Sequence, residues 1–103
     1  MSDIAARTMD DWRRMIDDID RELIKLLNER SQCALEIGKF KRLHNIAIYQ
    51  PEREREVLEN AERANAGPLA DTAIRRLFER ILDEARSLER QERREEPKED
   101  MKL

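Results

Sequence analysis

One arginine of this chain occupies a position where its neighbours predict a hydrophobic residue. Apolar residues recur from the N-terminal region at alternating spacings of four and three, and they are Trp12, Ile16, Ile19, Leu23, Leu26, Cys33, Ile37 and Phe40. This spacing is typical of a long helix that buries one stripe against partner helices. Arg30 falls in the same register. Its guanidinium keeps its charge and therefore requires an anion, a carboxylate neighbour or water. The pattern predicts either a structural ion pair or an anion-binding cavity at Arg30.

Further cations on the predicted helices would join Arg30. Lys41 lies about three helical turns beyond it, so both side chains leave the same face of one helix. Arg13 points off that face in its own chain, but in an antiparallel dimer it would reach the partner's cavity. Arg53 lies in the first turn of a second predicted helix. A cavity lined by these cations would favour a small molecule with two carboxylates.

Helix-breaking residues define where the first helix ends. No proline occurs from Asp11 to about Leu43, which predicts one long helix that is capped at its start by Asp10 or Asp11. Residues 44–50 then read as a connecting loop. Because several of its side chains are apolar, we expect this loop to be pinned to the rest of the domain.

Two shorter helices follow. Pro51 suits the first turn of a short second helix, because its missing N–H costs nothing there. That helix runs to about Asn65 and stops at Gly67-Pro68, a strong terminator pair. Asp71 is placed to cap a third helix of intermediate length. Its apolar face comprises Ile74, Leu77, Phe78, Ile81, Leu82, Ala85 and Leu88. The predicted fold class is all-α.

The composition fits one small helical domain. Charged residues make up 44% of the 103 residues and aromatic residues 4%, with two glycines and three prolines. We assign residues 10–90 to the domain, residues 1–9 to a flexible N-terminus and residues 91–103 to a charged tail that is frayed or disordered.

Charge and hydropathy limit the partners that we expect. The net charge of -3 does not indicate nucleic-acid binding, for which an excess of positive charge would be expected. No apolar run approaches the roughly 20 residues that span a bilayer, and residues 1–9 lack a signal-peptide core. We therefore expect a soluble, cytoplasmic protein without a membrane partner.

The single cysteine, Cys33, lies on the apolar stripe and is expected to be a small buried thiol.

The length of the first helix predicts a homodimer. A helix of about 33 residues is roughly 50 Å long, whereas a compact domain of this size has a radius of gyration of only about 13 Å. The apolar stripe nevertheless continues to Phe40. A second copy lying antiparallel is the simplest way to cover both ends of the stripe. We expect folding and association to be coupled.

Four segments resemble the all-α (AroQ-type) chorismate mutases. They are Trp12-Arg13-x-x-Ile16-Asp17-x-Ile19-Asp20, Leu26-Leu27-x-x-Arg30, Gly38-Lys39-x-Lys41 and Tyr49-Gln50-Pro51-x-Arg53-Glu54. The resemblance covers about residues 10–90, with the family's order and spacing. It implies an intertwined homodimer of three-helix chains that rearranges chorismate to prephenate, for aromatic amino-acid biosynthesis. This Claisen step is pericyclic and implies no metal, nucleophile or cofactor, so catalysis would rest on positioning and electrostatics.

The resemblance also implies a role for each charged residue. Arg13 of the partner chain and Lys41 would hold the side-chain carboxylate of the substrate, and Lys41 would also reach the ether oxygen. Arg30 would hold the ring carboxylate, and Arg53 would support that network. Glu54 would accept a hydrogen bond from the ring hydroxyl. Any one of these residues could instead be a solvated helix charge, but their joint order favours a site.

Three positions depart from the best-known form of the family's site. Gln50 stands where an Asp is frequent and can still hydrogen-bond a hydroxyl, whereas Ala85 replaces a Ser that contacts the ring carboxylate. Glu89 stands where a Gln commonly donates to the ether oxygen. Because an ionised carboxylate would repel the developing negative charge, Glu89 must carry a proton to assist, so we expect activity to fall as the pH rises.

Other functions fit parts of the same pattern. An isochorismate pyruvate-lyase uses the same scaffold, but Glu54 and the Gly38-Lys39-x-Lys41 step favour the mutase. An amino-chorismate mutase is a further alternative. From a different class, the chain could be a non-catalytic helical dimer or a regulatory partner of another shikimate-pathway enzyme. In that case Arg30→Leu should stabilise the protein, because apolar packing often replaces a buried charge favourably.

Overall fold

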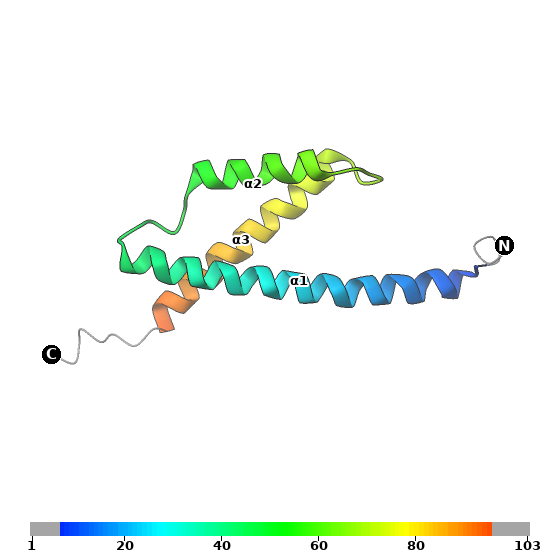
Figure 1. The fold of residues 1–103 in the computed structure, drawn as a ribbon, viewed down its shortest axis with the longest axis horizontal. Helices are drawn as coiled ribbons and strands as arrows, with labels where there is room; N and C mark the ends of the chain where they lie inside the picture. Colours follow the sequence, from blue (N-terminus) through cyan, green and yellow to red (C-terminus); the bar gives the residue numbers. More distant parts are fainter. Residues whose placement is uncertain (1–6, 96–103) are drawn as a thin grey trace. The chain divides into compact units, whose positions relative to one another are not determined.

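The computed structural model describes residues 7–95 and contains three α-helices in this range (Figure 1). They are α1 (Met9–Leu43), α2 (Pro51–Ala64) and α3 (Asp71–Glu95). The predicted all-α class, with one long, one short and one intermediate helix, is confirmed. Of the predicted flexible N-terminus and charged tail, residues 1–6 and 96–103 lie outside the described range, and residues 91–95 continue α3. None of the helices in this range is long and apolar enough to cross a membrane.

The chain divides into two parts, Met1–Gln32 and Cys33–Leu103. In the first part, α1 starts with a capping box rather than with the aspartate cap that we predicted. The Thr8 hydroxyl accepts a hydrogen bond from the Asp11 N–H (3.2 Å), and the Asp11 carboxylate accepts one from the Thr8 N–H (2.9 Å). These bonds satisfy donors that a helix start leaves without partners. The bonds from Thr8 lower the pKa of the Asp11 carboxyl.

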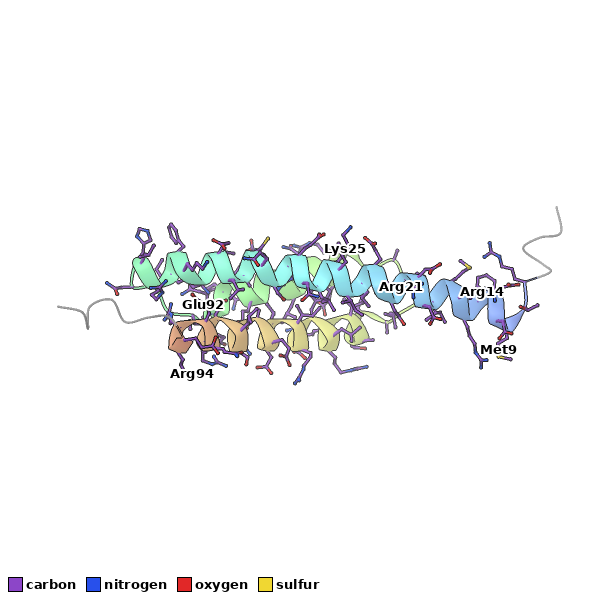
Figure 2. The ribbon with its side chains drawn as sticks, turned by 90° about the horizontal axis from the view of Figure 1, so that it is seen from below. Met9, Arg14, Arg21, Lys25, Glu92 and Arg94 are labelled. Carbon is purple, nitrogen blue, oxygen red and sulfur yellow. The ribbon has the colours of Figure 1, made fainter. Side chains whose placement is uncertain are left out.

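The apolar stripe of the first part is exposed in the single chain. Trp12 is 46% exposed, Ile19 59% and Leu26 52%. Figure 2 shows side chains projecting from this helix, with Arg14, Arg21 and Lys25 among those labelled. A helix by itself has no partner surface on which to bury such a stripe.

In the second part, asparagine ends α1 and the following loop is pinned. Asn45 adopts a left-handed conformation with φ 58°. The Ile46 N–H binds the Lys41 carbonyl oxygen (2.8 Å), and the Asn45 N–H binds that of Arg42 (3.4 Å). This pattern is a Schellman motif, in which Asn tolerates the left-handed position better than most residues do. The Lys41 side chain also binds the loop, at Ile48, as predicted for a pinned loop.

An asparagine also organises the turn between α2 and α3. The Asn65 side chain donates to the Leu69 carbonyl oxygen (2.8 Å) and to the Asp71 carboxylate (2.7 Å), and accepts from the Gly67 N–H (3.1 Å). Gly67 has φ 81°, a conformation that favours glycine. The prediction that Asp71 caps α3 was wrong, because Asp71 is the first helical residue and binds Asn65 instead. From this turn, α3 runs back toward the C-terminal end of α1 (Figure 1).

A second stripe of α1, made of small residues, packs in the second part. Ala34 and Gly38 are buried, together with Leu58 of α2 and Leu82 and Glu89 of α3. The predicted stripe is exposed here instead, at Cys33, Ile37 and Phe40, so the expected burial of the Cys33 thiol is wrong for the single chain. Small side chains let α3 approach α1 closely. No large side chain in the range 7–95 is less than 2% exposed, so this core is thin.

Candidate active site

Lys41 is the best-enclosed cation among the predicted site residues of the second part. Its side chain is 13% exposed, compared with 65% for Arg53. The ammonium donates a hydrogen bond to the Ile48 carbonyl oxygen at 2.7 Å, and it lies 3.4 Å from Oε1 of Glu89. An ammonium has three donors, so one remains for a ligand.

Glu89 is buried because Gly38 makes room for it. The Glu89 side chain is only 7% exposed and faces Lys41 from α3. A Cβ atom built at Gly38 would lie 3.1 Å from Cγ of Glu89 and 3.3 Å from its Oε1. These separations are tighter than ordinary van der Waals contact, so a Cβ atom at position 38 would require the Glu89 side chain to shift by a few tenths of an ångström. Gly38 therefore positions Glu89 against Lys41.

A second ion pair joins α2 to α3. Glu54, 19% exposed in its side chain, accepts a hydrogen bond from Nη1 of Arg86, which is 22% exposed. The second terminal nitrogen of Arg86 lies 3.3 Å from Asp83, and its guanidinium stands 5.5 Å from the centre of the Tyr49 ring. The hydrogen bond that Arg86 donates to Glu54, opposed by desolvation, raises the pKa of Arg86. Glu54 is thus paired within the chain, which the sequence did not lead us to expect.

The two ion pairs are linked by short stretches of chain. Arg86 precedes Glu89 by about one turn of α3, and Ile48, which binds Lys41, adjoins Tyr49. Our sequence interpretation missed Arg86. Its spacing from Glu89, which puts both residues on one face of the third helix, is the signal that could have identified it.

Two positions of the predicted site are uncharged, Gln50 before α2 and Ala85 on α3. Gln50 donates through Nε2 to the Ala47 carbonyl oxygen at 3.0 Å, so its side chain is bonded within the loop. Its own carbonyl oxygen accepts from the Glu54 N–H at 3.0 Å, which fixes the first turn of α2. Ala85 is partly buried and directly precedes Arg86 on α3.

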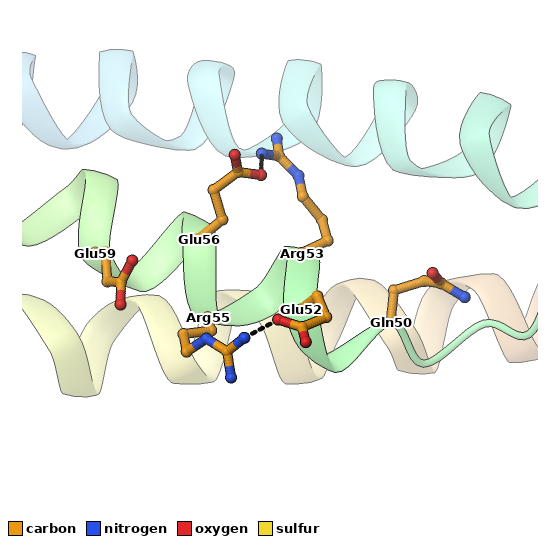
Figure 3. Close-up of a pocket in the computed structure, with 6 residues that line it drawn as sticks. All are labelled: Gln50, Glu52, Arg53, Arg55, Glu56 and Glu59. Carbon is orange, nitrogen blue, oxygen red and sulfur yellow. Dashed lines mark hydrogen bonds and ion pairs between the residues drawn. The ribbon is translucent and has the colours of Figure 1, made fainter.

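Arg53 is exposed and lines a shallow hollow on α2 (Figure 3). It pairs with Glu56 at 2.7 Å, and Arg55 pairs with Glu52. The hollow is lined by Gln50, Glu52, Arg53, Arg55, Glu56 and Glu59. Its three carboxylates outnumber its two guanidiniums, and both guanidiniums are already paired. A dianion is therefore disfavoured there, and the Lys41–Glu89 region is the better candidate for an active site.

The two remaining predicted cations belong to the first part. Arg13 is 67% exposed and lies 3.9 Å from Asp10. Arg30 is partly buried near the end of that part. Their membership of the site stays a prediction.

Comparisons with known proteins match most of this chain to one protein family. The family model described as chorismate mutase type II matches residues 12–90. A bifunctional chorismate mutase/prephenate dehydratase of Neisseria gonorrhoeae is 45% identical over 78 residues, which cover 76% of this chain and 21% of that protein. The chain thus spans about a fifth of the length of the bifunctional relatives that it matches.

Two further proteins match over most of their own length. A 4-amino-4-deoxychorismate mutase of Streptomyces pristinaespiralis is 35% identical over 86 residues, covering 82% of this chain and 67% of that protein. The solved structure of a chorismate mutase (form II) from Thermus thermophilus is 35% identical, with a TM-score of 0.75. That match covers 77% of this chain and 90% of the other.

Proposed function

Because this chain belongs to the chorismate mutase type II family, we propose that it rearranges chorismate to prephenate. The observation that carries this proposal is the enclosed pair of Lys41 and Glu89, whose charged atoms lie 3.4 Å apart. A Claisen rearrangement needs donors at the ether oxygen, where negative charge develops as the C–O bond breaks. Lys41 supplies one donor, and Glu89 supplies a second only in its protonated form.

Lys41 is suited to this task because it is already oriented. Its bond to the Ile48 carbonyl oxygen restricts the ammonium, so little ordering remains when the substrate binds. The other contribution to catalysis is positional. The site holds the flexible dianion in a compact chair conformation, which brings the two reacting carbons together.

The charges of the second part support a need for further cations. When Glu89 is ionised, it balances the charge of Lys41, and Glu54 balances that of Arg86. A substrate with two carboxylates would therefore leave an excess of negative charge. We assign the ring carboxylate to Arg30, with Arg53 as a supporting charge, and the side-chain carboxylate to Lys41 and to Arg13 of a second copy.

The second copy is itself part of the proposal. The apolar stripe of α1 is exposed over its whole length in the single chain, from Trp12 to Phe40, and the core is thin. Exposed apolar surface of this extent is typical of an obligate interface. A second chain that covers the stripe would also supply Arg13 in trans.

The direct test is the loss of chorismate absorbance with purified protein, followed by acid conversion of the product to phenylpyruvate. Arg30→Leu should lower kcat/KM by about 100-fold or more, because the ring carboxylate loses a charged hydrogen-bonding partner. Arg21→Leu is a matched control, since Arg21 is exposed and pairs with Asp18 on the same helix. Release of pyruvate from isochorismate, without turnover of chorismate, would instead assign the lyase activity. No turnover of either compound would leave a non-catalytic helical dimer.

A further inference from the structure

The ion pair between Glu54 and Arg86 has a consequence for substrate choice. Both side chains are about four-fifths buried, and Arg86 is held by residues of α2, of the connecting loop and of α3. We propose that Arg86 is a specificity-determining residue, which makes this end of the site accept a ring hydroxyl and reject a ring ammonium. This inference rests on the proposed mutase activity and on Glu54 as the group that meets the ring substituent.

The first reason is charge. A lone, partly buried carboxylate would attract an ammonium more strongly than it attracts a neutral hydroxyl. Here the guanidinium of Arg86 already neutralises Glu54 and occupies one of its oxygens. An ammonium brought to the remaining oxygen would stand close to a second cation. Repulsion between like charges in a partly desolvated site lowers affinity for the charged substituent.

The second reason is hydrogen-bonding capacity. A hydroxyl both donates and accepts, so it can donate to Glu54 while its oxygen accepts from an N–H of Arg86. An ammonium has three donors and no acceptor, so it leaves the N–H of Arg86 unmatched. A mixed pair of carboxylate and guanidinium is therefore complementary to a hydroxyl in particular. A site built to bond a hydroxyl discriminates strongly, because its buried polar groups lose partners when the hydroxyl is absent.

Related proteins differ in whether the ring of their substrate carries a hydroxyl or an amino group. One relative that is 35% identical to this chain is named as a mutase of the 4-amino compound. Side chains near the ring substituent must therefore determine which of the two substrates a protein of this fold prefers. Arg86 is the described cation that contacts Glu54, and it reaches the pair from a different helix.

The test compares kcat/KM for chorismate and for 4-amino-4-deoxychorismate near neutral pH, in the full-length protein. We expect the native protein to favour the hydroxyl substrate by more than about tenfold. Arg86→Gln removes the cation and should shift the ratio toward the amino substrate by about tenfold or more. Arg86→Lys keeps the charge and should largely retain the native ratio. The matched control is Arg76→Gln, because Arg76 is an exposed arginine on the same helix, about three turns from Arg86. The ratio of kcat/KM values should not change in this variant.

Glu54→Gln provides a second, opposite test that does not depend on Arg86→Gln folding. It leaves Arg86 without its carboxylate, so the ratio should move further toward the hydroxyl substrate. A ratio within about twofold of the native value in both Arg86→Gln and Glu54→Gln would overturn the inference while leaving the mutase activity in place. Failure of the native protein to turn over either substrate would instead refute the proposed function, and this inference with it.

Discussion

Lys41 and Glu89 form the contact on which the proposed chemistry depends. The sequence, through its resemblance to a family, led us to expect that these two residues act at one atom of the substrate. The structure places their side chains 3.4 Å apart and encloses both. Their catalytic roles remain predictions, and substitution of Glu89 tests them.

Glu89→Gln should retain or raise activity, because an amide N–H can donate to the ether oxygen whereas an ionised carboxylate would repel the negative charge that develops there. We expect kcat at neutral pH to equal or exceed that of the native protein, as measured by steady-state kinetics. Glu84→Gln is the control, on the exposed side of α3, and should leave kcat unchanged. A fall in kcat of about tenfold or more in Glu89→Gln alone would refute the assigned role.

Gly38→Ala should lower the activity of the protein while leaving its stability nearly unchanged. The added methyl group would lie 3.1 Å from Cγ of Glu89, so the side chain that holds the carboxyl group against Lys41 must shift by a few tenths of an ångström. A displacement of this kind should lower kcat by about tenfold. Alanine favours a helix interior by roughly 0.5–1 kcal/mol over glycine, which offsets the crowding, so the melting temperature should change little.

Gly67→Ala is the matched control for that experiment. Its left-handed conformation (φ 81°) disfavours alanine, although no atom lies within 4 Å of the new methyl group. We expect a loss of about 1 kcal/mol in unfolding free energy with an unchanged kcat. If Gly38→Ala lowered stability and left kcat intact, the positioning role of Gly38 would be wrong.

At the scale of the helices, the sequence predicted the elements well and their ends less well. The long proline-free stretch, Pro51 and the Gly67-Pro68 pair act through the backbone itself, so they define three helices without knowledge of the fold. The identity of a cap depends on which of several neighbouring polar side chains accepts a hydrogen bond from an N–H at the start of the helix. Thr8 makes the cap bond that we had assigned to an aspartate, and Asp71 binds the Asn65 side chain instead of capping α3.

Packing faces were harder to predict for a related reason. Ala34 and Gly38 contribute little hydrophobicity, so the stripe that packs within the chain is weaker in the sequence than the exposed stripe of large residues. The pair of Glu54 and Arg86 joins two helices whose crossing the sequence does not specify. Contacts of this kind become visible only when the helices are placed in space.

The capping box at the start of α1 should lose its effect in acid. The pKa of Asp11 is lowered from its ordinary value of 3.8 by the bonds from Thr8, so the ionised form stabilises the helix start. This contribution is present above pH 3.8 and is lost as the pH falls through the lower folded-state value. Amide exchange at residues 9–12 should therefore accelerate below that pH. Asp11→Asn should show the faster exchange already at neutral pH, whereas Asp10→Asn should change exchange much less.

At the scale of the whole molecule, the proposed dimer should be tested through its shared site. Arg13→Ala and Lys41→Ala should each be nearly inactive alone. When the two are unfolded together and refolded as a mixture, each heterodimer regains one site with both native residues. Random pairing should then restore about a quarter of the native activity. No recovery, with heterodimers demonstrated by native mass spectrometry, would place Arg13 outside the site or in the same chain.

The exposed apolar stripe of α1 has a further consequence, at the level of the cell. If two chains must meet to complete each site, the active species follows mass action, and its amount rises as the square of the chain concentration when most chains are single. Metabolic flux would then respond more than proportionally to expression of the gene. A modest fall in abundance would silence the pathway step well before the protein disappeared.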